Sequence, residues 1–293
     1  MRLPPFDLAV PETLAEAVGL LAAGPGESRV IGGGTALLPT MRLGLARPGR
    51  LISLHAIGGL DRIATDEGAL SLGGLATHAR VQRATLVREG WPLLAEAAGQ
   101  VASPAIRASG TVGGNLCYAE AASDVTPALL CLDAEVHLVG VAGERVVPVD
   151  QFFRGFYEPA LEPGEILVRL RLPAAPPRAH GGYVRFCPRA AEDKPLVGVA
   201  ALIATDDDGR CARVRIALGG AAPTPLRARA AEAALAGGEL SPSAIARAAE
   251  AAAAEAEPLG DLMGSAGYRR DMVRVWTRRL LTSILVPDSR LSC

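Results

Sequence analysis

The chain has 293 residues, of which 49% are hydrophobic and 21% charged, so it can bury a sizeable core in two or three compact units. Its formal net charge of −1 argues against nucleic acid or an anionic membrane as the main partner. No apolar run approaches the ~20 residues that span a bilayer, and the N-terminus lacks the apolar core of a signal peptide. We therefore expect a cytoplasmic protein without a membrane span.

The first predicted elements form a small α/β unit over residues 1–56. Thr13 and Glu16 have the spacing of a capping box, which predicts a helix that begins at Leu14. The expected elements after it are a strand at 28–31, a helix at 36–45 and a strand at 50–54.

Three glycines separate the strand at 28–31 from the helix that follows it. Glycine adopts positive φ easily and lets another group approach the backbone closely. A strand, a glycine turn and a helix start present backbone amides and the positive end of a helix dipole, which suits a phosphate. A tight turn without a ligand would use the same residues, so both interpretations stay open. The candidate binding residues are Val30, Ile31, Gly32, Gly33, Gly34, Thr35, Ala36 and Leu37.

Residues 57–172 form a second predicted α/β unit. Alternating apolar residues indicate strands, and a period of 3.6 residues indicates helices. The expected strands lie at 70–72, 135–141 and 166–172, and the expected helices at 81–89, 92–100 and 124–132.

A second glycine cluster, residues 108–116, is interpreted as another turn rich in small and hydroxyl-bearing residues. Two facing turns could clamp a pyrophosphate from both sides. Leu37 stands where the dinucleotide fingerprint has its third glycine, and no GxxxxGK[ST] motif occurs, so neither a Rossmann nor a P-loop site is expected. The candidate residues in this cluster are Thr111, Val112, Gly113, Gly114 and Asn115.

The third predicted unit spans residues 173–293. It opens with a proline-rich linker at 173–177, because proline cannot continue a strand ladder. Strands followed by helices indicate an α+β domain, here a three-stranded antiparallel sheet plus three helices. The expected strands lie at 183–187, 196–204 and 212–218, and the helices at 225–236, 242–257 and 268–284.

The chain resembles the FAD-binding (medium) subunit of the molybdenum hydroxylases, a group that includes the xanthine and carbon monoxide dehydrogenases. The similar motifs are Gly32-Gly33-Gly34-Thr35, Thr111-Val112-Gly113-Gly114-Asn115 and the segment 123–130, and further matches follow at 215–225, 267–272 and 277–280. The resemblance implies an α+β protein. Two small α/β subdomains would form a FAD-binding domain of the PCMH or vanillyl-alcohol-oxidase type, followed by a C-terminal domain of the CO dehydrogenase flavoprotein type.

The same resemblance implies an electron-transfer role. Substrate would be oxidised at a molybdenum cofactor on a large partner subunit, and electrons would cross [2Fe–2S] clusters on a small partner subunit to FAD on this chain. FAD would pass them to NAD⁺, a quinone or another acceptor. The complex would be a dimer of heterotrimers. We expect non-covalent FAD, since the first glycine turn holds no histidine or cysteine to form a flavin linkage.

Four positions outside the glycine clusters have both a structural and a cofactor interpretation. Asp124 and Ser123 suit a helix N-cap, and the resemblance places the aspartate at the flavin end of FAD. Arg185, in mid-strand, would lie on a solvated face or, by resemblance, beside the isoalloxazine ring. Leu167 would serve core packing or a backbone contact to that ring. Tyr118 is assigned to the cofactor site by resemblance alone.

Other chemistry has little support in the sequence. The cysteines are 117, 131, 187, 211 and 293, without a CxxC pair, so buried free thiols are expected and no metal site. No histidine pair has ligand spacing; His137 is expected at the surface and His78 at a helix start. No catalytic residue is assigned. A self-contained flavin oxidase or dehydrogenase and a non-catalytic nucleotide-binding assembly module stay as alternatives.

Two charged segments complete the sequence predictions. The connection at 189–194 carries no aromatic residue that would shield a flavin ring. The last helix is basic, with either a solvated face or a surface for an acidic partner subunit. Its arginines are Arg269, Arg270, Arg274, Arg278 and Arg279.

Overall fold

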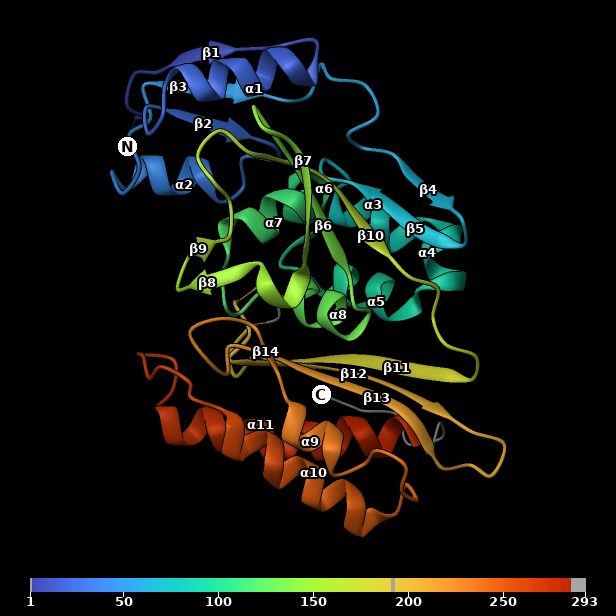
Figure 1. Ribbon diagram of the computed structural model, residues 1–293. Helices are drawn as coiled ribbons and strands as arrows, with labels where there is room; N and C mark the ends of the chain where they lie inside the picture. The colour runs from blue at the N-terminus through green and yellow to red at the C-terminus, as the bar shows by residue number, and fades with distance from the viewer. Residues whose placement is uncertain (1, 191–192, 286–293) are drawn as a thin grey trace.

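The computed structural model describes residues 2–190 and 193–285, so the expected thiol of Cys293 lies outside the described residues. Three sheets stack along the molecule, with the N-terminal sheet at the top of Figure 1 and the C-terminal sheet and helices at the bottom. Helices accompany each sheet, which confirms the predicted α+β class. Within the described residues no helix is both long and apolar enough to cross a membrane.

The N-terminal sheet is parallel and has the strand order β1-β3-β2. Its strands are β1 (Asp7–Ala9), β2 (Ser28–Ile31) and β3 (Arg50–Ser53), and its helices are α1 (Leu14–Ala23) and α2 (Leu37–Arg42). Thr13 caps α1 by accepting a hydrogen bond from the Glu16 amide, 3.2 Å away, as the capping box predicts. β1 has three residues and was not expected, because such a short strand forms only through its pairing with β3.

The middle sheet is antiparallel, with the order β4-β5-β10-β6-β7. Its strands are β4 (Ile63–Asp66), β5 (Ala69–Gly73), β6 (Glu135–Gly140), β7 (Gly143–Pro148) and β10 (Ile166–Leu172). A 3₁₀ turn (Val149–Gln151) and a hairpin of β8 (Phe153–Gly155) and β9 (Glu158–Pro159) join β7 to β10. Both faces of β10 are buried: Leu170 belongs to the main core, and Ile166 and Val168 to the N-terminal core.

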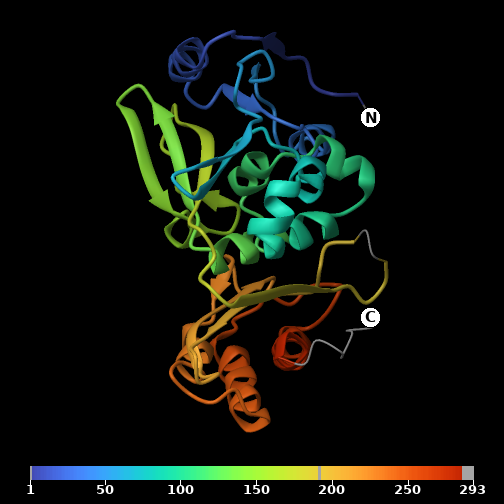
Figure 2. The same cartoon turned by 90° about the vertical axis from the view of Figure 1, so that its right-hand side faces the viewer.

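The helices of this region lie together on one side of the middle sheet (Figure 2). They are α3 (His78–Arg83), α4 (Thr85–Gly90), α5 (Pro92–Gln100), α6 (Pro104–Ser109), α7 (Val112–Tyr118) and α8 (Val125–Cys131). The helix expected at 81–89 is two helices, since Ala84 is extended with ψ 119°. The second glycine cluster is not a simple turn, because Thr111 starts α7 by accepting a hydrogen bond from the Gly114 amide at 3.1 Å.

The C-terminal sheet has four strands, not the predicted three, in the order β11-β12-β13-β14. They are β11 (Ala179–Phe186), β12 (Val197–Thr205), β13 (Cys211–Gly219) and β14 (Leu226–Arg227), followed by α9 (Arg229–Ala233), α10 (Pro242–Glu255) and α11 (Ala266–Leu285). The first residues of the helix expected at 225–236 instead pair with β13. The sheet separates these three helices from the helices of the middle region (Figure 1). Because Tyr183, Ala200 and Ala217 belong to the main core, the two regions share it.

Candidate cofactor site

The first glycine turn connects β2 to α2. Gly34 has φ 68°, in the left-handed region that favours glycine, and its carbonyl accepts the hydrogen bond of the Leu38 amide at 3.0 Å. No described residue accepts a hydrogen bond from the amides of Gly33, Gly34 or Thr35. The three residues are only partly exposed. A row of such amides attracts an oxygen-rich anion, because partly buried backbone N–H groups need acceptors.

The second glycine segment lies directly against the first. A Cβ atom on Gly33 would come within 2.0 Å of the Ser109 carbonyl oxygen and 2.9 Å of the Gly110 Cα atom. A Cβ atom on Gly32 would lie 3.0 Å from the Thr111 hydroxyl. The structure thus brings together two segments that lie about 75 residues apart in the sequence, and glycine is required at Gly33 for that contact.

A third segment, residues 73–78, completes this junction and was missed by sequence reasoning. Thr77 pairs with Thr111 in an antiparallel bridge, and the His78 amide donates to the Gly110 carbonyl at 3.0 Å. The Gly113 amide donates to the Gly74 carbonyl at 3.0 Å, so no side chain fits at Gly113. The signal that could have found this segment is the Gly73-Gly74 pair directly after a strand.

His78 is the first residue of α3, as predicted, and Thr77 is its N-cap. Its side chain is buried with 2% exposure, and no described group bonds its Nδ1 atom. Burial lowers the pKa of His78 to about 4, and the positive charge of Arg107 adds to this effect. The imidazole is therefore neutral at pH 7.

Asp124 does not make the N-cap bond expected of it. Ser123 caps α8 instead, accepting a hydrogen bond from the Thr126 amide at 3.3 Å, while its hydroxyl donates to Asn115 Oδ1 at 2.6 Å. Asp124 Oδ1 accepts the Tyr183 hydroxyl at 2.8 Å and lies 3.1 Å from Arg185 Nε. No described donor contacts the second oxygen, Oδ2. The carboxylate makes no hydrogen bond to the amides of α8 and bonds this side-chain cluster instead.

Arg185 is not on a solvated face. Its side chain is 10% exposed, and its Nη1 atom donates to the Gln100 carbonyl at 2.8 Å. Burial raises the pKa of Asp124 to about 6, although Arg185 and the Tyr183 hydroxyl both oppose that rise. The Asp124–Arg185 pair thus spans the boundary between α8 and β11, with little access to water.

Leu167 lies near the start of α7, beside the Gly74–Gly113 contact, and Tyr118 is the last residue of that helix. Leu167 is buried with 6% exposure, and its carbonyl oxygen would lie 2.6 Å from a Cβ atom on Gly74. Tyr118 ends α7 and packs edge-on against Tyr157, with the ring centroids 5.1 Å apart. Leu167 therefore lies beside the glycine junction, and Tyr118 beside the β8–β9 hairpin.

Three other sequence predictions need correction. His137 is buried with 6% exposure, and Glu144 and Arg169 contact its Nδ1 atom at 2.8 and 3.1 Å. Arg269 is also buried and donates to the Leu196 carbonyl at 2.7 Å, so the last helix is not solvated along its whole basic face. Cys131 and Cys211 are buried free thiols, whereas Cys117 and Cys187 are partly exposed.

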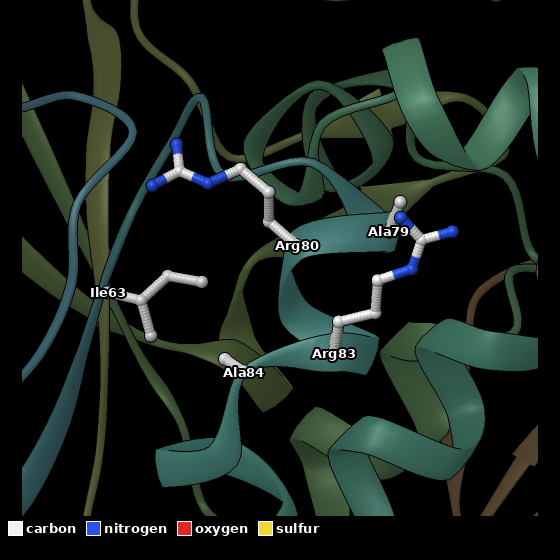
Figure 3. Close-up of a pocket in the computed structure, with 5 residues that line it drawn as sticks. All are labelled: Ile63, Ala79, Arg80, Arg83 and Ala84. Atoms are coloured by element: carbon white, nitrogen blue, oxygen red, sulfur yellow. The ribbon is translucent and has the colours of Figure 1, made fainter.

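A separate hollow of about 370 Å³ lies beside α3, and none of the predicted site residues lines it (Figure 3). Ile63, Ala79, Arg80, Arg83 and Ala84 line it. Arg80 pairs with Asp61, and both side chains are about half exposed. An exposed pair of this kind is screened by water and contributes little to binding or stability.

Comparison with known proteins identifies the family. Residues 4–175 match the FAD binding domain in molybdopterin dehydrogenase, and residues 182–284 match the CO dehydrogenase flavoprotein C-terminal domain. The chain belongs to this FAD-binding family. It is an oxidoreductase subunit of the molybdenum hydroxylase type, which confirms the predicted resemblance, and residues 4–175 are its FAD-binding domain.

Relatives match this family member over nearly their whole length. The 6-hydroxypseudooxynicotine dehydrogenase complex subunit alpha of Paenarthrobacter nicotinovorans is 33% identical over 97% of this chain and 96% of its own. The carbon monoxide dehydrogenase medium chain of Afipia carboxidovorans is 33% identical over 94% of each chain. A chain of carbon monoxide dehydrogenase from Hydrogenophaga pseudoflava superposes with a TM-score of 0.95 at 34% identity, covering 98% of this chain and 99% of that one.

Proposed function

We propose that this chain carries FAD as the electron-transfer subunit of a molybdenum hydroxylase complex. In this proposal a large partner subunit holds the molybdenum cofactor and a small one holds [2Fe–2S] clusters. FAD here takes electrons from those clusters and passes them to NAD⁺, a quinone or another acceptor. The names of the relatives support this division, since they are medium chains or single subunits of dehydrogenase complexes.

The observation that carries the proposal is the glycine junction. The free amides of Gly33, Gly34 and Thr35 suit the oxygens of a pyrophosphate, and the helix start at Thr111 lies against the same turn. We assign the diphosphate to this junction, with Val30, Ile31, Gly32, Ala36 and Leu37 on one side and Val112, Gly113, Gly114 and Asn115 on the other. We assign the isoalloxazine ring to the side of Ser123, Asp124 and Arg185, with Leu167 contacting the ring from beside the glycine junction and Tyr118 at the edge of the site.

Bound FAD supplies the redox chemistry, because it accepts and releases electrons at the isoalloxazine ring. The protein groups bind and tune it. Asp124 Oδ2 is available to a donor on the ring, while Oδ1 is held by Tyr183 and Arg185. The fixed charge of Arg185 favours added negative charge on a neighbouring ring, and Asp124 partly offsets it. No side chain is assigned as a catalytic acid or base.

The organisation of the complex extends this proposal. We propose three units with boundaries at 56/57 and 172/173, a cytoplasmic location, and assembly as a dimer of heterotrimers. The two family matches, at 4–175 and 182–284, support the second boundary. Among residues 2–190 and 193–285, no group of three His, Cys, Asp or Glu side chains could hold a metal ion.

Purification of the complex from its native source tests the proposal. We expect two further subunits, with molybdenum and iron in the large and small ones, and a yellow chromophore on this chain that acid precipitation releases completely. Flavin retained on the denatured chain would contradict non-covalent binding. Substrate oxidation by the isolated chain would instead favour a self-contained flavin oxidase or dehydrogenase.

A further inference from the structure

The turn between α5 and α6, residues 100–103, has an unusual backbone. Ala102 has φ 37°, in the left-handed region that residues with a Cβ atom rarely adopt. Such a conformation persists only where surrounding contacts hold it, and these positions cluster at functional sites.

Two arginines hold this turn by its carbonyl oxygens. Arg107 Nη1 donates to the carbonyls of Val101 and Ala102, at 2.8 and 2.7 Å. Arg185 Nη1 donates to the carbonyl of the preceding residue, Gln100, at 2.8 Å. Three consecutive carbonyls therefore each accept a hydrogen bond from a guanidinium group, which is a strong charge-assisted interaction.

The turn connects the two parts of the proposed FAD site. On one side, Arg185 links Gln100 to Asp124, where the flavin ring is assigned. On the other side, the turn leads into α6, which ends at Ser109, and the Ser109 carbonyl packs against Gly33 in the glycine junction. A change in the turn would therefore move both the Arg185–Asp124 pair and the start of α7.

We infer that Arg107 is a positioning residue for FAD. It holds Ala102 in the left-handed conformation and so fixes the distance between the ring contacts and the diphosphate contacts. This inference rests on the proposed function. A different action of Arg107, through its own charge on the cofactor, makes a different prediction, because that action would not depend on the conformation of Ala102.

The double variant R107M/A102G separates the two actions. Glycine adopts positive φ without a steric penalty, so A102G removes the need for a clamp. In R107M, we expect the dissociation constant of FAD to rise at least tenfold in titrations of flavin-stripped full-length chain. In R107M/A102G, most of the lost affinity should return. R83M is the matched control, because Arg83 projects from α3 at the hollow in Figure 3. The R83M chain should bind FAD with the affinity of the parent.

The flavin midpoint potential gives a readout that a purely structural role would not move. In fully loaded R107M the potential should fall, because the Gln100 carbonyl that holds Arg185 is no longer fixed. In the double variant the potential should return toward that of the parent. Unchanged affinity and potential in R107M would overturn the inference. So would a loss of affinity that A102G does not restore, since Arg107 would then act through its charge.

Folding failures also decide between the possibilities. If R107M does not fold but R107M/A102G folds and binds FAD, the clamp on Ala102 is supported directly. If neither variant folds, Arg107 is a residue of the fold and the inference is wrong. A parent chain that binds no FAD would overturn the proposed function itself, a result that the variants cannot imitate.

Discussion

At the scale of single residues, the two members of the buried Asp124–Arg185 pair should have opposite effects on the flavin midpoint potential. Removing the charge of Arg185 with Arg185→Met should lower the flavin midpoint potential, and Asp124→Asn should raise it. A net change of about 1–2 kcal/mol, or about 20–40 mV for a two-electron couple, is expected in each case after screening. Redox titration of fully loaded protein measures both. Shifts in the same direction would indicate general damage to the site and not an electrostatic effect.

His78 should make stability dependent on pH. Its folded pKa of about 4 lies below the ordinary value of 6.5, so between these values the unfolded chain binds a proton that the folded chain does not. This contribution is complete above pH 6.5 and is lost as the pH falls toward 4, by up to about 3 kcal/mol. His78→Gln should therefore flatten the acid side of the stability profile measured by urea unfolding.

The parent must be compared with His78→Gln because Asp124 changes the pH dependence of stability in the opposite direction. Its raised pKa of about 6 makes the folded chain bind a proton more readily than the unfolded chain, which adds stability as the pH falls from 6. The parent profile contains both effects, and only the difference between parent and His78→Gln isolates the histidine. Parallel profiles between pH 6.5 and 4 would contradict the assignment.

At the scale of elements, the contact between the two glycine segments can be broken at one atom. Gly33→Ala places a Cβ atom where the Ser109 carbonyl oxygen lies, so the segments must separate. We expect loss of FAD together with about 1–3 kcal/mol of stability, as for other overpacked sites. Even the smallest added side chain at Gly33 should therefore disturb the fold as well as empty the site.

Gly58→Ala is the control for this change. A Cβ atom on Gly58 would meet no atom within 4 Å, so FAD content and the free energy of unfolding should stay within about 0.5 kcal/mol of the parent. Flavin absorbance and urea unfolding, measured on both variants, provide the comparison. Full flavin occupancy in Gly33→Ala would show that the two segments bind no cofactor at their contact.

Elements with strong local signals were predictable, and those that depend on pairing or capping were not. α5 has the predicted bounds of 92–100, because Pro92 starts it and its apolar periodicity is clear. α7 was missed because Gly113 and Gly114 favour a turn, and the Thr111 cap that offsets them shows only in the structure. β14 has two residues and exists only by pairing with β13.

For the candidate site, the sequence motifs identified the two glycine segments and Asp124 but not what holds them in place. Tyr183, two residues before Arg185 on β11, bonds Asp124, and Gln100 at the end of α5 bonds Arg185; no local pattern indicates such contacts. Strand alternation suggested the surface placement of His137 and one of the two interpretations of Arg185. It fails for Arg185 because its charged partner Asp124 is buried beside it, whereas His137 is buried although its partner Glu144 is half exposed.

At the scale of the whole molecule, one carboxylate connects the FAD-binding domain to the C-terminal sheet. Asp133, after α8, accepts hydrogen bonds from Arg213, Arg215 and Arg227, the last two at 3.2 and 3.1 Å. Asp133→Asn keeps the shape of the side chain, and asparagine tolerates the left-handed φ of 48° that Asp133 adopts. We expect it to lower stability by about 1–3 kcal/mol, because the arginines lose their shared negative partner.

Thermal unfolding checks this expectation. A loss of that size should lower the melting temperature by about 2–5 °C in a chain of this length. Asp150→Asn is the matched control, because Asp150 pairs with a single arginine, Arg229, whose side chain is 63% exposed. Equal melting temperatures for the two variants would show that Asp133 does not join the domains.

The position of β10 has a consequence for synthesis on the ribosome. β10 comes last in the FAD-binding domain but lies at the centre of its sheet, between β5 and β6. Until Ile166–Leu172 leave the exit tunnel, the edges of β5 and β6 that pair with β10 in the folded chain have no partner. Exposed strand edges of this kind promote aggregation. Nascent chains arrested before Ile166 should therefore bind chaperones and no flavin. Chains arrested after β13 should begin to bind flavin while still attached to the ribosome.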